Sequence, residues 1–142
     1  MIWPKDFSNR LTSWVDLRQQ VLELEAPVAL STLNRWWLHS PWCPYYLHWD
    51  DFQDWPDPWQ LLSDNIYCDI ARGLGIMYTL AMLDRKDLGN SILVESDQGN
   101  LVLVDDEKYI LNWSPSQVVN TSLSVSKIKR RVTQEQLLHK FK

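Results

Sequence analysis

Cys68 is the residue of this sequence best placed to do chemistry, because it stands at the predicted start of a long helix. Unpaired amides and the helix dipole at such a position lower the pKa of a thiol and favour the nucleophilic thiolate. Thiol catalysis also requires a histidine that contacts the sulfur and a polar group that orients the histidine. A small cysteine on a helix is also a common core residue, so its position alone leaves both roles open.

The segments around Cys68 follow one another in a recognisable order. Trp-Pro-Asp-Pro-Trp-Gln-Leu-Leu at residues 55–62 leads to Cys-Asp-Ile-Ala at residues 68–71. The segments at residues 91–95 and 99–105 follow, and they contain the first two predicted strands. This order resembles the core of the transglutaminase-like cysteine proteinases over residues 55–113. The resemblance implies a transglutaminase- or papain-like core in which a cysteine begins the central helix.

The same resemblance implies catalytic roles for two residues, but this sequence lacks the histidine of the family pattern. It implies that Cys68 is the nucleophile and that Asp105, or less well Asp106, orients the histidine. The family's histidine falls on one of three positions that carry no base: Gly89, Asn90 or Ser91. Without a general base, the steps that need one lose about a hundred- to ten-thousand-fold in rate. We therefore predict a degenerate, non-catalytic copy of this core.

Two histidines outside the matched positions could restore a base. His48 arrives from the segment before the helix, and His139 lies near the end of the chain. Convergent triads show that the order of such residues along the chain is free. The alternative function is therefore a cysteine hydrolase or acyltransferase with Cys68 as nucleophile, Asp105 as orienting acid and His48 as base.

The sequence predicts no metal and no cofactor. Four residues could in principle form a zinc set, but their spacing matches no common zinc finger: His39, Cys43, His48 and Cys68. Four aspartates between residues 50 and 57 lack the glycine turn and the late glutamate of a calcium loop. Acidic residues among prolines are typical of helix caps and solvated loops.

The hydrophobic pattern predicts the elements that must position these residues. Apolar side chains recur at helical spacing in three segments and alternate in three later ones. The predicted helices span residues 6–25, 27–39 and 66–83, and the predicted strands span residues 91–95, 101–104 and 108–113. We therefore expect an α+β fold, with N-terminal helices and the helix led by Cys68 packed on a small three-stranded antiparallel sheet.

Length and charge predict one domain with a distinct tail. A chain of 142 residues accommodates a single core. Its net charge is −4, but six basic residues against one acidic residue give residues 122–142 a charge of +5 and leave −9 on residues 1–121. We predict a globular domain over residues 1–121 and a basic tail over residues 122–142, with a short helix that Thr133 caps.

Nine tryptophans dominate the composition and suggest a binding surface. So small a core leaves some aromatic side chains outside, and exposed tryptophans are good interface anchors. The residues predicted to contact a partner are Trp42, Trp49, Trp55, Trp59, Lys129, Arg130 and Arg131. We expect a protein partner or self-assembly, with the basic tail docked on an acidic partner or on the body itself. A third class of function is nucleic-acid binding through the tail. The sequence disfavours it, because the acidic body repels phosphates.

The sequence favours a soluble protein of the cytoplasm. No apolar run reaches the roughly 20 residues that span a bilayer, and the first residues lack the order of a signal peptide. The Trp-Trp and Trp-Pro-Asp-Pro-Trp clusters in a chain of this size resemble small proteins of tailed bacteriophages. That resemblance implies a place in the host cytoplasm or the virion and a role in assembly.

Overall fold

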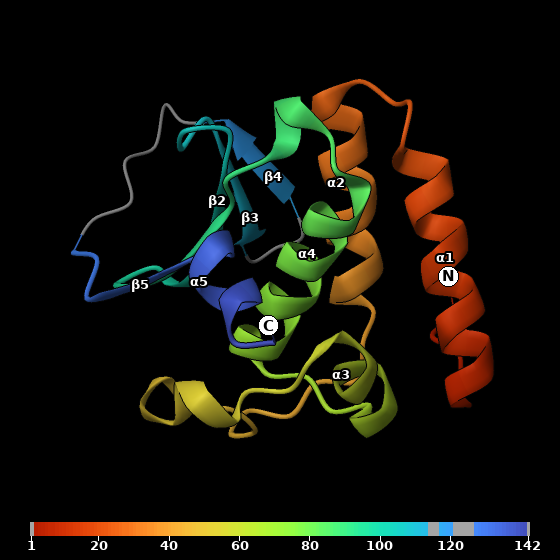
Figure 1. Ribbon diagram of the computed structural model, residues 1–142, viewed down its shortest axis with the longest axis horizontal. Coiled ribbons are helices and arrows are strands. Elements are labelled where there is room, and N and C mark those ends of the chain that lie inside the picture. Colours follow the sequence, from red (N-terminus) through yellow and green to blue (C-terminus); the bar gives the residue numbers. More distant parts are fainter. Residues whose placement is uncertain (1, 114–116, 121–126, 142) are drawn as a thin grey trace.

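A computed structural model describes residues 2–113, 117–120 and 127–141. The helices of these residues are α1 (Phe7–Val21), α2 (Ala26–Leu38), α3 (Pro58–Asp64), α4 (Asp69–Leu83) and α5 (Gln134–His139), with 3-10 turns η1 (Trp49–Asp54) and η2 (Lys86–Leu88). The strands are β1 (Ile92–Ser96), β2 (Gly99–Val104), β3 (Tyr109–Trp113), β4 (Gln117–Asn120) and β5 (Arg130–Thr133). The α+β class is confirmed (Figure 1).

The sheet has five strands in the order β4-β3-β2-β1-β5, and every neighbouring pair is antiparallel. The sequence predicted only three of these five strands, and β1, β2 and β3 lie where it predicted them. β5 comes from the basic tail and pairs with β1, with Arg131 opposite Val94. In β5 only Val132 is buried, so this edge strand lacks the alternating apolar pattern that identifies a half-buried strand.

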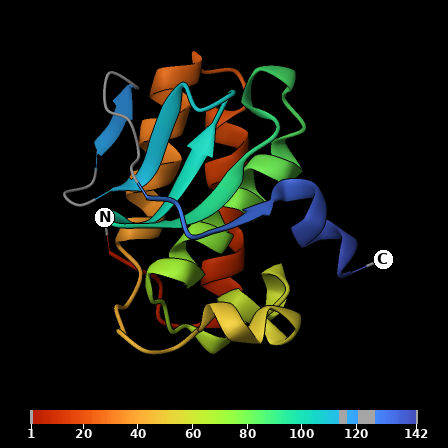
Figure 2. The same ribbon diagram turned by 90° about the vertical axis from the view of Figure 1, so that its left-hand side faces the viewer.

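Helices cover one face of the sheet. α4 packs against β1, β2 and β3, and α2 lies beside α4 and reaches β3 and β4 (Figures 1 and 2). α1 forms an outer layer on α2, while α5 follows β5 at the opposite edge. The start of α4 therefore lies between the sheet, the end of α2 and the aromatic segment that precedes α3.

The helix starts follow cap signals that are visible in the sequence. Asp6 accepts a hydrogen bond from the Asn9 amide at 2.8 Å, and Asp57 accepts one from the Gln60 amide at 2.8 Å. Thr133 begins α5 with a capping box. Each side chain satisfies an amide that the helix itself leaves unpaired.

Two tryptophans and one threonine form a buried polar cluster in the helical layer. The indole nitrogens of Trp14 and Trp37 donate to Thr79 Oγ1 at 2.9 and 3.0 Å. The Thr79 hydroxyl donates to the Gly75 carbonyl at 2.7 Å. Trp37 lies so close to α4 that a Cβ on Gly75 would stand 2.5 Å from Trp37 Cε3. The residue at this position of the helix is glycine because the ring needs the space.

The described part of the chain contains no helix that is both long enough and apolar enough to cross a membrane.

Candidate functional site at the start of helix α4

Cys68 is the N-cap residue of α4, at the position that the sequence predicts for a nucleophile. Its side chain is 4% exposed, and its sulfur accepts a hydrogen bond from the Leu47 amide at 3.4 Å. The Leu47 amide contacts the sulfur beside the helix start, whereas burial hides the sulfur from a substrate. Cys68 therefore occupies the predicted position at the helix start but lacks the access that a nucleophile needs.

The structure does not assemble the predicted triad. His48 follows Leu47 and is exposed, and no hydrogen bond among the described residues joins its imidazole to Cys68. Asp105 lies in the turn after β2, whereas Asn100, near the opposite end of that strand, lies at the start of α4. Five residues of extended chain span about 16 Å, so Asp105 is remote from Cys68.

The histidine-equivalent segment and the second alternative base also lie away from the thiol. Ser91 is buried, and its hydroxyl donates to Gln134 Oε1 at 2.9 Å. His139 is exposed on α5 and lines a different hollow, together with Phe52 and Lys140. Among the residues that the structure describes, no group of three or more histidine, cysteine or acidic side chains is placed to hold a metal ion.

The four tryptophans predicted to anchor a partner divide into exposed and buried ones. Trp42 and Trp59 are 52% and 54% exposed. Trp49 is half-buried and donates through Nε1 to Asn100 Oδ1 at 2.8 Å. Trp55 is 3% exposed and donates to the His48 carbonyl at 2.8 Å, so its ring belongs to the core and offers nothing to a partner.

The predicted basic residues lie against the body. Lys129, Arg130 and Arg131 are all exposed, along or beside β5. Arg130 forms ion pairs with Asp50 at 2.8 Å and with Glu95 at 3.3 Å. These contacts place part of the positive tail on acidic side chains of the same chain.

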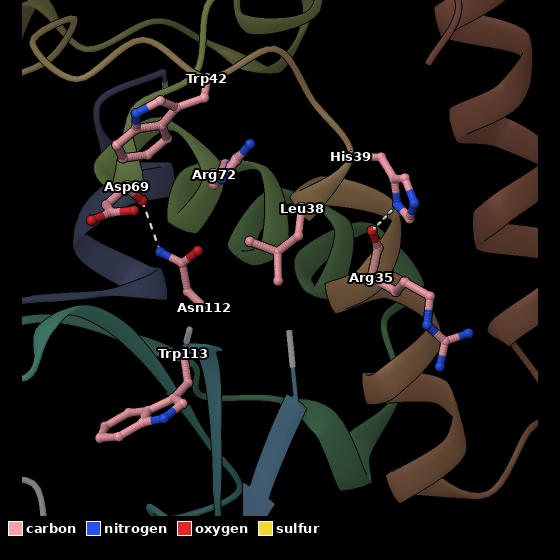
Figure 3. Close-up of a pocket in the computed structure, with 8 residues that line it drawn as sticks. All are labelled: Arg35, Leu38, His39, Trp42, Asp69, Arg72, Asn112 and Trp113. Atoms are coloured by element: carbon pink, nitrogen blue, oxygen red, sulfur yellow. Dashed lines mark hydrogen bonds between the residues drawn. The ribbon is translucent and has the colours of Figure 1, made fainter. Parts of the chain in front are cut away.

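A cavity of about 530 Å³ opens beside the first turn of α4 (Figure 3). Sequence reasoning did not identify it. Its walls come from the end of α2, the loop that follows it, the first turn of α4 and the end of β3. The lining residues are Arg35, Leu38, His39, Trp42, Asp69, Arg72, Asn112 and Trp113.

Asn112 connects the sheet to the helix start in this cavity. Its Nδ2 donates to the carbonyls of Asp69 and Asn100, both at 2.8 Å, and its amide donates to Asn34 Oδ1 at 2.9 Å. Two carbonyl acceptors fix which end of the side-chain amide is nitrogen. The Asn112 side chain is buried, and its Oδ1 has no hydrogen-bond partner among the residues that the structure describes. In Figure 3 this oxygen points away from Asp69, toward the part of the cavity beside Leu38 and Arg72.

The backbone at Asn112 is as unusual as the side chain. Its φ of +64° is in the left-handed region, and the pairing of β3 with β4 shifts between Ile110 and Trp113. Asparagine adopts this region more readily than most residues. The irregularity turns the Asn112 side chain toward the helix start, where a regular strand would not direct it.

Opposite charges lie one helical turn apart on the same wall. Burial raises the pKa of the Asp69 carboxyl, and the positive charge of Arg72 partly offsets the effect. Burial likewise lowers the pKa of Arg72. The Arg72 guanidinium donates to Ser40 Oγ at 3.0 Å and to the Ser40 carbonyl at 2.6 Å, and lies 5.0 Å from the centre of the Trp42 ring. These contacts hold Arg72 in place beside Asp69.

Weak signals for this cavity exist in the sequence. Asp69 and Arg72 have the i, i+3 spacing that places two side chains on one helix face. Asn112 interrupts the apolar strand pattern just before Trp113. Neither signal indicates that a strand and a helix start converge, because that depends on the register of the sheet.

The comparisons with known proteins leave the family open. No protein-family model matches the chain, and no curated protein or solved structure shows significant similarity to it.

Proposed function

We propose that this chain is a non-catalytic protein-interaction module, and that its contact surface is the loop that presents Trp42 and Tyr45. These side chains are 52% and 82% exposed, yet the loop is held by backbone bonds. The Cys43 amide donates to the Tyr67 carbonyl at 3.0 Å, and the Tyr67 amide donates to the Pro41 carbonyl at 3.1 Å. Large aromatic side chains on a fixed backbone bind a partner with little loss of conformational entropy. This exposed, fixed aromatic pair is the observation that carries the proposal.

The absence of catalysis is part of the same proposal. A transglutaminase-like core would place a base in the segment that ends at Ser91, and no residue of that segment is a base. The burial of Cys68 and the remote position of Asp105 both count against a working thiol site. A cysteine-led helix packed on an antiparallel sheet supports descent from such a core, with a role in assembly.

Photo-crosslinking tests the interaction directly. A photoreactive phenylalanine at Tyr45 is expressed from the native gene in its own cells, and the matched control carries it at Trp59, which is 54% exposed on α3. We expect one adduct that forms from position 45 and not from position 59. The partner identified in it should then lose at least about tenfold in affinity for the purified Trp42→Ala protein. Equal adducts from both positions, or none from position 45, contradict the proposal.

The second candidate, a cysteine hydrolase or acyltransferase, has one observation in its favour. The Cys68 sulfur lies at a helix start and accepts the Leu47 amide hydrogen bond at 3.4 Å. We would measure the rate of alkylation by iodoacetamide against pH in a Cys43→Ser background, with and without His48→Ala. Rapid labelling with an apparent pKa well below about 8.5, lost with His48, supports the enzyme. Labelling that requires unfolding makes Cys68 a core residue and excludes it as a nucleophile.

A further inference from the structure

The cavity beside the first turn of α4 contains an arginine with unused hydrogen-bond donors, next to the proposed contact loop. Arg72 donates through Nε to Ser40 Oγ at 3.0 Å and through Nη2 to the Ser40 carbonyl at 2.6 Å. These two bonds occupy one side of the guanidinium fork. The end formed by Nη1 and Nη2 has no partner among the described residues, and Nη1 is accessible to solvent, unlike the unpaired Nε of Arg18. A ligand in the cavity can therefore contact this end of Arg72.

Arg72 is held in this orientation before any ligand binds. Ser40, which accepts both of its bonds, is buried. The ring of Trp42 covers one face of the guanidinium, with the ring centre 5.0 Å from Arg72 Cζ. A guanidinium that is already fixed loses little side-chain entropy on binding, and its parallel N–H groups match the two oxygens of a carboxylate.

The part of the cavity beyond Arg72 is positively charged. Arg35 and His39 line that side, whereas Asp69 lies on the other side of Arg72, beneath Trp42 (Figure 3). Arg35 is exposed, and within the described part of the chain no ion pair involves Arg35 or joins Asp69 to Arg72. Two guanidinium groups against one carboxylate leave a net positive charge on the cavity wall, which attracts an anion.

A single negative charge suits this wall better than several. Asp69 offsets one of the two guanidinium charges, and the net charge of −4 on the chain opposes a partner with a run of acidic residues. Leu38 and the half-exposed ring of Trp42 line the cavity and offer apolar surface to methylene groups. A glutamate side chain combines one carboxylate with two methylene groups.

We infer that the partner of the Trp42–Tyr45 loop inserts a glutamate side chain into this cavity, with its carboxylate on the Nη1–Nη2 end of Arg72. Trp42 belongs both to the loop and to the cavity wall, so the two surfaces are continuous. A cavity of about 530 Å³ has room for this side chain and for part of the residues that flank it. The inference rests on the proposed interaction and names the chemistry of its partner.

The first arm of the test uses small probes on the unchanged protein and needs no identified partner. N-acetyl-L-glutamate α-amide is titrated into the ¹⁵N-labelled chain at low salt concentration, and the indole signal of Trp42 is followed. N-acetyl-L-glutamine amide is the neutral, isosteric control, and N-acetyl-O-phospho-L-serine amide carries a second negative charge. We expect a Kd on the order of 10 mM for the glutamate probe and at least about tenfold weaker binding of the glutamine probe. No saturable shift up to about 50 mM, equal binding of the glutamine probe, or tighter binding of the phosphoserine probe overturns the inference.

The second arm changes the protein. Arg72→Gln should weaken binding of the glutamate probe by at least about tenfold, and Arg35→Gln by about threefold, because Arg35 is exposed. Arg131→Gln removes the same charge from an exposed arginine that lines a different hollow, and should bind like the parent. The thermal midpoint of each variant shows whether it is folded. If Arg72→Gln does not fold, Arg72→Lys replaces it, since lysine keeps the charge and loses the parallel N–H groups. Binding by the folded Arg72 variant that equals binding by Arg131→Gln contradicts the assignment.

The probes and the photo-crosslinking at Tyr45 fail for different reasons. If the glutamate probe does not bind but Tyr45 forms its adduct, the loop interaction is supported and the carboxylate site is wrong. If the probe binds through Arg72 but Tyr45 forms no adduct, the carboxylate site is supported and the loop interaction is contradicted.

Discussion

The buried polar groups in the middle of α4 differ from those beside its first turn in how many of their hydrogen bonds the protein supplies. In the middle of the helix, the Thr79 hydroxyl accepts hydrogen bonds from the indoles of Trp14 and Trp37 and donates one to Gly75. Beside the first turn, Asn112 uses both of its donor groups, and its Oδ1 has no partner within the described part of the chain. The first cluster is completed by the protein's own atoms, and the second is not. A complete buried network helps to specify a unique core, whereas an incomplete one leaves part of the cost of burying its polar atoms uncompensated.

The side chains around the Thr79 cluster are also more buried and less charged than those around Asn112. Trp14, Trp37 and Thr79 are at most 1% exposed and pack between α1, α2 and α4. The cavity beside Asn112 has charged side chains and the half-exposed ring of Trp42 in its wall. Removing a polar contact should therefore cost more stability in the first region than in the second.

Thr79→Val should have the largest effect, because it leaves two buried indole donors without an acceptor at nearly constant volume. Each unmatched donor costs about 1–3 kcal/mol, so we expect about 3 kcal/mol less stability. Urea unfolding, followed by tryptophan fluorescence, measures the change. Thr32→Val is the matched control, since its hydroxyl also bonds to a carbonyl four residues earlier, at 2.8 Å, but near the surface. Equal losses in the two variants would contradict the role of the shared threonine.

Gly75→Ala should be the next largest effect. The added Cβ would stand 2.5–2.6 Å from three atoms of the buried Trp37 ring, which has no free space to move. Overpacking of this kind costs about 2 kcal/mol even after the gain in helix propensity. Gly73→Ala is the comparison, because its Cβ would meet the flexible end of Leu93 at 2.7 Å. We expect a smaller loss there, and the reverse order in thermal midpoints would refute the packing argument.

Most of the helical layer could be predicted from the sequence, because its signals are local. The apolar spacing predicted the helices α1, α2 and α4, and the cap at Thr133 predicted the short helix α5. The strand β5 could not be predicted, because three of its residues are exposed or half-buried and only Val132 is buried. An edge strand of this kind is held by backbone pairing with β1, and backbone pairing requires no alternation of apolar and polar residues in the sequence.

The candidate site was less predictable than the fold. Cys68 was placed correctly at a helix start, but its burial depends on the packing of the segment that contains Leu47. The cavity beside it depends on the register that turns Asn112 toward α4, and register is a property of the whole sheet. Single-residue signals therefore identified the helix start and missed the residues that line it.

Trp42→Ala should have a small effect on stability, in contrast with the core tryptophans. The ring is half exposed and loses mainly its contact with the Arg72 guanidinium, 5.0 Å from the ring centre. A loss of about 1 kcal/mol is expected. Trp59→Ala is matched in exposure at 54% and should cost a similar amount of stability. The two variants should differ in partner binding, which only Trp42→Ala weakens. A stability loss for Trp42→Ala as large as that of Thr79→Val would place Trp42 in the core instead.

Asp69→Asn should give the smallest change in stability, and the size of the change should depend on pH. Burial raises the pKa of Asp69 in the folded state above the value of about 3.9 in the unfolded chain. The stabilising contribution of this carboxyl is therefore complete below about pH 4 and is lost as the pH rises through the folded pKa. Near pH 7 Asp69→Asn should be slightly more stable than the parent, by about 0.3 kcal/mol because the group is only partly buried. Near pH 3 the two proteins should unfold alike in urea.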